Sequence, residues 1–325
     1  MKKSESRLRD SIKQGRFILF QDGRRPLLRP GPSSDQLDFR LPSFSFQEVQ
    51  EVLPEPLETN GTALIDLLPR QSGCEDDDEA VWLPFLAAPL QLSDQQAQAV
   101  ERRLSGRFMD ARAGVVSGAM GLEAQLLAKS LSLLRWSRHW RHCPACGGLL
   151  NMALSKAVAT CTSCALTHYP PTSPVAIVLI TNAERSQLLL VQLPISRNGV
   201  WTCVAGFSEP GEPLEETARR EAAEEVGVEL GPVSWAGASQ GWPFPAASLM
   251  VGFEAVAEVC QPSPMLSEVK DAAWWSREEV RRAYEAALSR PREAVAREKI
   301  VEERFAFIPP KGTMAFHLIE GWLHS

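Results

Sequence analysis

Short apolar runs separated by polar turns predict several strands in the second half of the chain. The runs at 175–180 and 188–192 read VAIVLI and LLLVQ and stand on either side of a polar turn. Further runs cover 200–205, 233–238 and 248–259. Apolar runs of this length, bounded by turn residues, are typical of buried strands. We therefore expect a mixed sheet in this part of the chain.

A Glu-rich segment after the third run predicts one helix over 213–226. Pro213 suits the first helical position, where its missing N–H is not needed, and Gly227 suits the residue just past a helix end. Gly206 and Gly211 allow the loop before the helix to fold back tightly. The backbone of this loop and Glu212 are therefore expected to lie near the start of the helix.

Three carboxylates of this helix are spaced i, i+3 and i+4 and so share one face: Glu221, Glu224 and Glu225. Like charges so close destabilise a helix unless something offsets them. Hard oxygen ligands on a rigid element are what Mg²⁺ or Mn²⁺ with a bound phosphate requires. Arg220 can orient the set through forked hydrogen bonds. An ordinary solvated acidic helix face is the alternative interpretation.

Residues 206–228 fill every fixed position of a longer pattern, G-x5-E-x7-R-E-U-x-E-E-x-G-U, where U is aliphatic or small. The chain therefore resembles a Nudix hydrolase. The resemblance implies a Nudix fold of the α/β and α+β classes, with a mixed β-sheet packed between helices, over 171–325. It also implies Mg²⁺- or Mn²⁺-dependent hydrolysis in which four residues act: Arg220, Glu221, Glu224 and Glu225.

Four of the seven cysteines form two C-x2-C pairs about fifteen residues apart: Cys143, Cys146, Cys161 and Cys164. This is the spacing of a four-cysteine zinc ribbon, expected over 141–170, with Gly147 and Gly148 in a tight turn. The zinc is predicted to be structural, because four thiolates leave no open position for a substrate. Disulfides and a redox C-x2-C pair are the alternatives, disfavoured by the missing secretory signal and by the two matched pairs. The flanking His139, His142 and His168 are predicted to be packing or surface residues.

A second signature follows the Glu-rich helix, where residues 239–250 read SQGWPFPAASLM. It resembles the SQPWPFPxS stretch of the NADH pyrophosphatase branch of the Nudix hydrolases. Two prolines and two aromatic residues make a stiff loop with flat apolar surfaces, on which a base or nicotinamide ring can stack. A plug for the hydrophobic core is the alternative role of such a loop.

The resemblance to this branch also implies the residues of a dinucleotide pocket. Phe207 and Tyr169 would hold a flat ring between them, with the tyrosine contributed by the other subunit of a homodimer. Gln240, Trp242 and Ala315 would line the same pocket. The chain departs from the branch in three ways: Gly241 replaces a proline, one extra residue stands between Pro245 and Ser248, and Pro171 replaces an arginine that many relatives carry.

A further metal ligand of the branch precedes an A-x-W element, and Glu268 occupies the matching position. A solvent-facing loop carboxylate is the alternative interpretation of this residue. Beyond it, Ser276 and Glu279 form a capping box that opens a helix reaching about residue 289, and a final helix begins near Thr313.

Residues 1–140 predict a small α+β domain without a visible catalytic cluster. Its expected elements are strands at 18–20, 63–68 and 81–85 and helices at 94–104 and 122–140, the first helix with Ser93 as its N-cap.

Length and charge narrow the classes of function. A chain of 325 residues is expected to form two or three compact units. A net charge of −6 argues against a sequence-independent nucleic-acid binder, and no Lys/Arg-rich stripe with interleaved aromatic residues is obvious, although folding could assemble one. No apolar stretch approaches the length of a membrane span, so no membrane association is expected.

The N-terminal segment bears on the compartment. It is basic but has no apolar core, so secretion is not expected. Three stretches resemble the animal mitochondrial member of the branch: the form SQxWPFPxxSLM at 239–250, the run YPxxxPVAI that ends at Ile177, and Pro309-Pro310-Lys311. A mitochondrial location is therefore predicted, with the cytoplasm as the alternative.

Together these features predict an enzyme that hydrolyses the pyrophosphate of NADH or NADPH to reduced nicotinamide mononucleotide and AMP or 2′-phospho-AMP. Removal of NAD-type caps from RNA 5′ ends is an alternative with the same chemistry. A catalytically inactive dinucleotide sensor is a third hypothesis, against which the complete pattern at 206–228 argues.

Overall fold

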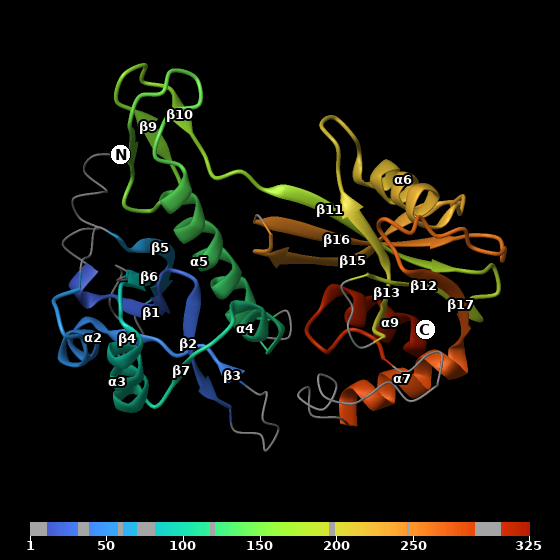
Figure 1. Cartoon of the computed structure of the whole chain (residues 1–325), viewed down its shortest axis with the longest axis horizontal. Coiled ribbons are helices and arrows are strands. Elements are labelled where there is room, and N and C mark those ends of the chain that lie inside the picture. Colours follow the sequence, from blue (N-terminus) through green and yellow to red (C-terminus); the bar gives the residue numbers. More distant parts are fainter. Residues whose placement is uncertain are drawn as a thin grey trace, which may run out of the picture. The chain divides into compact units, whose positions relative to one another are not determined.

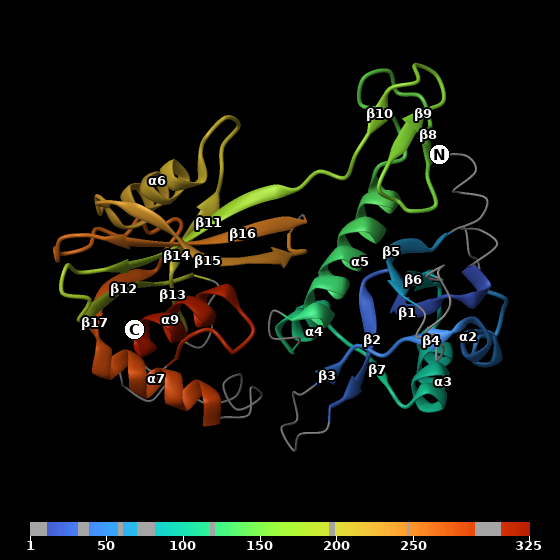
Figure 2. The same cartoon turned by 180° about the vertical axis from the view of Figure 1, so that it is seen from behind.

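The computed structural model describes residues 12–31, 39–57, 61–69, 82–117, 121–194, 199–245, 247–289 and 307–325. Contacts divide the chain into two compact units, one formed almost wholly by residues up to Pro171 and the other by Thr172–Ser325 (Figures 1 and 2). Most of the basic N-terminal segment lies outside the described residues. None of the described helices is both long and apolar enough to cross a membrane.

The first unit contains a mixed sheet with the strand order β3-β2-β1-β6-β5, in which β1 and β6 are parallel. The short strands β4 and β7 pair with β1 and β2. The strands are β1 (Arg16–Gln21), β2 (Arg25–Pro30), β3 (Phe39–Arg40), β4 (Phe44–Ser45), β5 (Ala63–Pro69), β6 (Trp82–Leu90) and β7 (Arg107–Phe108). The helices are η1 (Ile12–Gln14), α2 (Phe46–Val52), α3 (Asp94–Leu104), α4 (Ala111–Ser117) and α5 (Leu122–His139).

The predicted elements of this region are found in the structure. The strands expected at 18–20 and 63–68 fall within β1 and β5, and α3 has the predicted bounds. The strand expected at 81–85 overlaps β6 from residue 82 onward, and residue 81 lies outside the described residues. Ser93 caps α3 by accepting a hydrogen bond from the Gln96 N–H at 3.3 Å, and the Gln96 side chain returns a bond to the Ser93 N–H. This reciprocal pair satisfies two N–H groups that the first turn leaves free.

Three short antiparallel strands follow α5 and carry the cysteine pairs: β8 (Leu150–Met152), β9 (Ala159–Cys161) and β10 (Thr167–His168). They belong to the first unit by contact, and they form a small lobe beyond the end of α5 (Figure 1). The division of this unit into an N-terminal domain and a separate ribbon stays a prediction.

The second unit is built on another mixed sheet, with the order β13-β12-β11-β16-β15. The central β11 is parallel to β16 and antiparallel to β14, while β17 pairs with β12. The strands are β11 (Ser173–Thr181), β12 (Gln187–Gln192), β13 (Trp201–Thr202), β14 (Val204–Phe207), β15 (Val233–Trp242), β16 (Ser248–Val256) and β17 (Asp271–Ser276). The helices are α6 (Leu214–Val226), α7 (Arg277–Ser289) and α9 (Met314–His324).

Helices cover both faces of this sheet, which explains why its strands are continuous apolar runs. Alternate residues of β11 point to opposite faces. Val178 and Ile180 pack in the core that contains α6 residues, whereas Ile177 and Leu179 pack in the core formed with α7 and α9. The α6 helix and the α7–α9 pair are seen on opposite sides of the sheet in Figures 1 and 2.

Several boundaries differ from the predicted ones. The run at 200–205 is two strands, because β13 pairs with β12 while β14 pairs with β11, and Cys203 lies between them. Pro213 is the N-cap of α6, so this helix begins one residue later than predicted. The strand expected over 248–259 ends at Val256.

Candidate active site

Three carboxylates meet beside α6. Glu221 and Glu225 lie one turn apart on this helix, and Glu268 comes from the turn before β17. One oxygen from each lies within 4.8 Å of the others. The turn that carries Glu268 is attached to the helix, since the Met265 N–H donates to the Glu225 backbone oxygen at 2.8 Å and the Glu268 N–H donates to Met265 O at 2.9 Å. Local backbone hydrogen bonds therefore bring a distant carboxylate to the helix face.

Arg220 organises the other carboxylates at this helix. Its Nε and Nη2 donate to the two oxygens of Glu212 at 2.8 and 3.0 Å, a bidentate pair. Its Nη1 donates to Glu221 Oε1 and Glu224 Oε2, each at 2.9 Å, and Nη2 also donates to Phe207 O at 2.9 Å. The bonds to Glu212, and then those to Glu224 and Glu221, raise the pKa of Arg220. One guanidinium thus connects the loop before the helix to two helix carboxylates.

Glu212 was not among the predicted site residues, although it stands at a fixed position of the pattern. The Arg220 side chain, then the Glu209 N–H and the Thr217 hydroxyl, lower the pKa of Glu212 to about 2. A carboxylate with this many donors stays ionised and fixed in position. The fixed E of the pattern was the available signal, and its role is to hold Arg220 in place.

Gly206 is the residue that allows the loop to approach the helix carboxylates. A Cβ added at Gly206 would overlap the carboxylate of Glu221. The first position of the pattern therefore needs glycine for space. At the other end of α6, Gly227 has a φ of 66° and its N–H donates to Ala223 O at 3.0 Å, which closes the helix.

Glu225 has the least polar surroundings of the three clustered carboxylates. Burial, and then the negative charges of Glu221 and Glu268, raise the pKa of Glu225 to about 8. Burial also raises the pKa of Glu221, against the hydrogen bond from Arg220. Oε2 of Glu225 is buried and has no hydrogen-bond partner among the described residues. An unpaired buried carboxylate beside two others is what a site for a hard cation provides.

A cavity of about 230 Å³ adjoins this cluster, and Glu225 forms part of its wall. Three of the predicted pocket residues, Gln240, Trp242 and Ala315, line the same cavity. Gln240 is buried, and its Nε2 donates to Gly312 O at 2.9 Å, while its Oε1 has no partner within the described part of the chain. The remaining lining residues are mostly apolar, from β11, β13, β16 and α9 among other segments.

The two predicted stacking residues lie outside this lining. The side chain of Phe207 is 47% exposed at the end of β14, and that of Tyr169 is 68% exposed. Phe207 belongs to the second unit and Tyr169 to the first. Both rings therefore present free aromatic surface.

Comparison with known proteins adds to this geometry. A family model described as the NUDIX domain matches residues 171–298. The chain is 32% identical over 334 residues to the NAD-capped RNA hydrolase ndx-9 of Caenorhabditis elegans, covering 98% of this chain and 86% of that protein. It is 30% identical over 335 residues to the mitochondrial NAD(P)H pyrophosphatase NUDT13 of Mus musculus, covering 100% of this chain and 89% of that protein. The chain belongs to the Nudix hydrolase family.

A third relative is the human NAD-capped RNA hydrolase NUDT12, 27% identical over 331 residues, with 94% of this chain and 66% of that protein covered. The match with the NADH pyrophosphatase branch of the Nudix family, predicted from residues 239–250, is confirmed by these relatives. The fold prediction of a Nudix domain with mixed sheet and helices is confirmed as well.

The four cysteines of this Nudix protein form a second cluster, with all four sulfur atoms within 4.8 Å of one another. Cys143 Sγ lies 3.8 Å from Cys164 Sγ, and Cys146 Sγ lies 3.5 Å from Cys161 Sγ. Backbone N–H groups, first that of Cys164 and then that of Ser163, lower the pKa of Cys161 to about 6. The arrangement is consistent with a zinc ribbon, whose ligands are thiolates.

The glycines predicted for the tight turn are found in it. Gly147 has a φ of 74°, and its N–H donates to Cys143 O at 2.8 Å. A Cβ added at Gly148 would overlap the Ser163 side chain. His168, predicted as a packing or surface residue, places its Nε2 3.3 Å from Cys143 Sγ. Sequence reasoning missed this contact, because the spacing of the cysteines along the chain does not show how close His168 lies to them.

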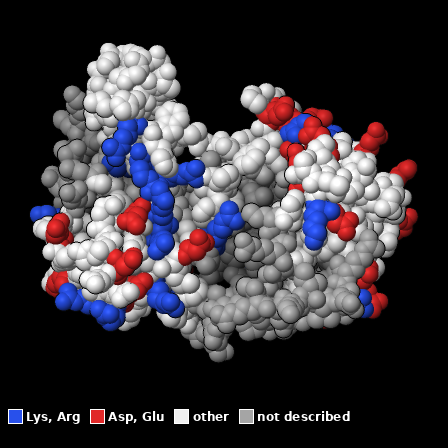
Figure 3. Space-filling model, in the orientation of Figure 1, with Lys and Arg blue, Asp and Glu red and all other residues white. Residues whose placement is uncertain are grey.

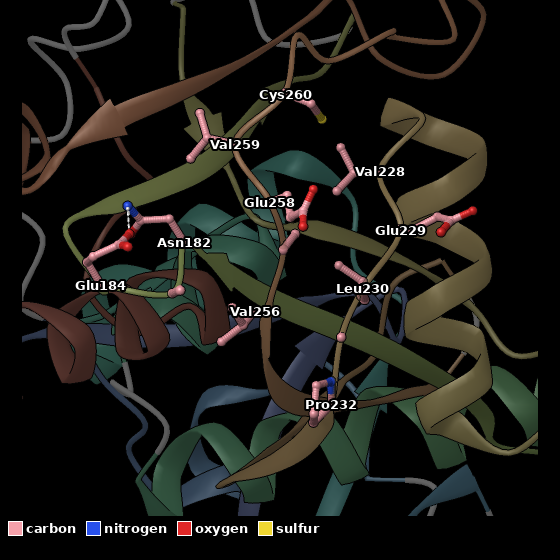
Figure 4. A pocket seen from close by; sticks show the side chains of 13 residues that line it. Asn182, Glu184, Val228, Glu229, Leu230, Pro232, Val256, Glu258, Val259 and Cys260 are labelled. Carbon is pink, nitrogen blue, oxygen red and sulfur yellow. Dashed lines mark hydrogen bonds between the residues drawn. The ribbon is translucent and has the colours of Figure 1, made fainter.

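A larger cavity of about 860 Å³ lies elsewhere in the Nudix unit and includes none of the predicted site residues. In Figure 4, Asn182 and Glu184 stand on one side of it, Glu229 on the other, and Glu258 between them. Asn182 Nδ2 donates to Glu184 Oε2 at 3.0 Å. Size alone therefore does not locate the chemistry, which depends on the carboxylate cluster of the smaller cavity.

Proposed function

We propose that this protein hydrolyses the pyrophosphate bond of NADH or NADPH, giving reduced nicotinamide mononucleotide and AMP or 2′-phospho-AMP. The observation that carries the proposal is that the carboxylate cluster and the smaller cavity adjoin each other through one residue. Glu225 belongs to the carboxylate cluster and also lines the cavity with Gln240 and Trp242. A reacting phosphate and a bound ring would then be held side by side.

The residues fit a catalytic divalent cation, Mg²⁺ or Mn²⁺. Glu221, Glu225 and Glu268 offer hard oxygen ligands, and the buried Oε2 of Glu225 has no hydrogen-bond partner among the described residues. When bound, such an ion neutralises phosphate charge and lowers the pKa of a water molecule that attacks phosphorus. Glu224, which bonds Arg220, is proposed to complete the set as the predicted fourth carboxylate.

The protein's own groups would fix the geometry of the site. Arg220 uses Oε1 of Glu221, so the other oxygen of that carboxylate stays available as a ligand. Glu212 holds the guanidinium from its other side with two bonds. Because the guanidinium is held at both ends, the helix carboxylates need little rearrangement when a substrate binds.

The cavity fits one flat ring of a dinucleotide. Its volume of about 230 Å³ lies below the usual range for whole drug-sized ligands, roughly 300–1,000 Å³. The unpaired Oε1 of Gln240 can accept a hydrogen bond from an amide or amino group, and the Trp242 ring offers an apolar face. The resemblance assigns Phe207 and Tyr169 to the same pocket, but neither lines this cavity, and we propose that they stack on a ring outside it.

The test is hydrolysis by the purified protein with Mg²⁺, with Mn²⁺ and with chelator. The substrates are NADH, NADPH, NAD⁺, ADP-ribose and diadenosine polyphosphates, and products are identified by mass. Metal-dependent release of reduced nicotinamide mononucleotide is expected, fastest from a reduced dinucleotide. Tight binding of NADH without turnover under any metal condition would instead favour the sensor hypothesis.

Removal of NAD caps from RNA is a second candidate function. Relatives covering most of this chain are named as NAD-capped RNA hydrolases, and a surface rich in arginine, described below, offers a place for RNA. A gel assay with an NAD-capped transcript beside free NADH separates the two substrates. A higher kcat/KM for cap removal than for free NADH would make RNA the preferred substrate.

Zinc in the cysteine cluster is proposed to stabilise the ribbon. Four thiolates in two knuckles leave no ligand position for a substrate. Elemental analysis of the purified protein should give one zinc per chain, retained after removal of weakly bound divalent ions. A chain that folds fully and contains no zinc would contradict this role.

The compartment and the oligomeric state are proposed from the resemblance to the mitochondrial member of the branch. The NUDT13 relatives from Mus musculus and Homo sapiens are both named as mitochondrial. A mitochondrial homodimer is expected, and fractionation of cells together with the mass in solution tests it. A mass in solution of about half that of the dimer would contradict the homodimer. Recovery in the cytoplasmic fraction alone would contradict the mitochondrial location.

A further inference from the structure

The sequence around α5 and the cysteine ribbon lacks acidic residues, although the whole chain has a net charge of −6. From residue 124 to residue 183 it contains five Lys or Arg and no Asp or Glu. Three of these five, Arg135, Arg138 and Arg141, lie in the last turns of α5 or directly after it. An acidic chain that keeps one region free of carboxylates presents a local surface that attracts anions.

Folding adds a fourth arginine from another element. Arg138 Nη1 donates to Asp22 O at 2.8 Å in the turn between β1 and β2, which places Arg24 close to Arg138. Arg141 Nε donates to Arg138 O at 3.3 Å. Figure 3 shows Lys and Arg side chains gathered directly below the ribbon. We name this surface the arginine face, formed by Arg24, Arg135, Arg138 and Arg141.

The charges of the arginine face are not neutralised within the described structure. None of its four members forms an ion pair with a described residue, whereas Arg220 pairs with three carboxylates. Burial, and then the positive charges of Arg24 and Arg135, lower the pKa of Arg138, and the Asp22 charge opposes this as the smallest influence. Nε of Arg138 is buried without a partner among the described residues. An anion bound here would remove repulsion that the fold leaves in place.

The chemistry of this face favours a phosphodiester chain. All four groups are guanidinium ions, whose forked donors match phosphate oxygens. The ring of Trp140, between two of the arginines in sequence, is half-buried against Trp136 and His168, with centroids at 6.4 and 6.5 Å. Arginines beside an aromatic ring are typical of surfaces that bind single-stranded nucleic acid.

We propose that the arginine face binds the sugar–phosphate backbone of single-stranded RNA that carries an NAD-type 5′ cap. The proposal rests on the second candidate function, removal of that cap. It adds a residue set for the RNA chain itself, which the carboxylate site does not recognise. Free NADH, which has no such chain, would not use the arginine face.

Binding of an uncapped, 5′-labelled single-stranded RNA to the full-length protein, in chelator and across a salt series, tests the proposal directly. The variant R24Q/R135Q/R141Q changes three exposed arginines and keeps Arg138, which bonds Asp22 O. We expect RNA affinity to fall at least about tenfold and the log–log salt slope to decrease by about two, since each lost phosphate contact removes roughly 0.7. The control R102Q/R107Q/R282Q removes the same charge from exposed positions elsewhere and should bind RNA like the wild type.

Hydrolysis kinetics then test whether the arginine face contributes to binding of the capped RNA substrate. The R24Q/R135Q/R141Q variant should show a KM for NAD-capped RNA raised about as much as its RNA affinity is lowered, with an unchanged rate on free NADH. Equal RNA binding by this variant and the control would overturn the proposal. Loss of binding to phosphatidylserine vesicles but not to RNA would overturn it in favour of a membrane surface. Absence of all dinucleotide hydrolysis would refute the proposed function alone, because the RNA measurement in chelator needs no turnover.

Discussion

The cysteine cluster and the carboxylate cluster can each hold a metal ion, but they are built in opposite ways. The four cysteines come from two knuckles, their sulfur atoms lie within 4.8 Å, and none of them lines either described cavity. The three glutamates supply fewer ligands, and Glu225 also forms part of a cavity wall. A closed set of soft ligands can only stabilise, whereas an open set of hard ligands can admit a phosphate. Substitutions in the two clusters should therefore affect different properties.

The largest expected effect is on catalysis, from Glu225→Gln. This change keeps the shape of the side chain and removes a charged ligand, so kcat should fall more than about a hundredfold. The thermal midpoint measured without metal should not fall, because Glu225 is protonated in the folded state without metal and its Oε2 has no hydrogen-bond partner among the described residues. Steady-state hydrolysis at saturating Mn²⁺, with Glu229→Gln as the control at an exposed carboxylate, measures the difference. A rate near that of the wild type would remove Glu225 from the site.

In the cysteine cluster, Cys161→Ser should lower stability and leave the carboxylate cluster unaffected, the opposite of Glu225→Gln. Loss of one thiolate should release zinc and lower the thermal midpoint of the protein, because the ribbon has few other buried groups. The affinity of the carboxylate cluster for Mn²⁺, measured by electron paramagnetic resonance, should stay unchanged. Cys260→Ser changes an exposed cysteine outside the cluster and serves as the control. Parallel loss of zinc and Mn²⁺ would show that the two clusters are coupled.

A smaller effect is expected from Gly206→Ala. The added methyl group would overlap the Glu221 carboxylate, so either the loop or the ligand must move. A displacement of this kind should lower kcat about tenfold or more while the protein stays folded. The control is Gly321→Ala on α9, where an added Cβ meets no atom within 4 Å. Equal kcat values for the two variants would mean that the loop moves to accommodate the methyl group without disturbing the catalytic carboxylates.

The helix that carries the carboxylates could be predicted closely because its limits are local. Gly227 ends α6 through a left-handed conformation that its own sequence permits, and the predicted C-terminal bound agrees with the structure. The apolar runs likewise indicated buried strands, and β11 is buried on both faces, through Val178 on one and Ile177 on the other. Periodicity and capping chemistry are sufficient for such elements.

The different surroundings of Glu224 and Glu225 could not be predicted from the helical periodicity. Spacing places both on one side of α6, but they are 100° apart around the helix axis. The Glu224 side chain, 50% exposed, bonds Arg220, while Glu225 is buried and meets Glu268. Which of the two meets Glu268 depends on the hydrogen bond between Met265 and the helix, a contact that no local pattern encodes. The break between β13 and β14 at Cys203 was also missed because it depends on contacts between distant segments. The two strands pair with different partner strands.

The smallest expected effect is a pH dependence of stability that belongs to the carboxylate cluster alone. Burial, with the charges of Glu221 and Glu268, raises the pKa of Glu225 to about 8, from an ordinary value of 4.5. The folded state without metal therefore holds a proton on Glu225 that the unfolded state loses, so the free energy of unfolding should decrease as pH rises from about 4.5 to about 8. Thermal midpoints across this range, compared with those of Glu225→Gln, isolate the contribution of this group. The variant should lose less stability over the range, by a few degrees in midpoint, and saturating Mn²⁺ should reduce the slope of the wild type. Identical slopes for both proteins would show that Glu225 is solvated well enough to ionise normally.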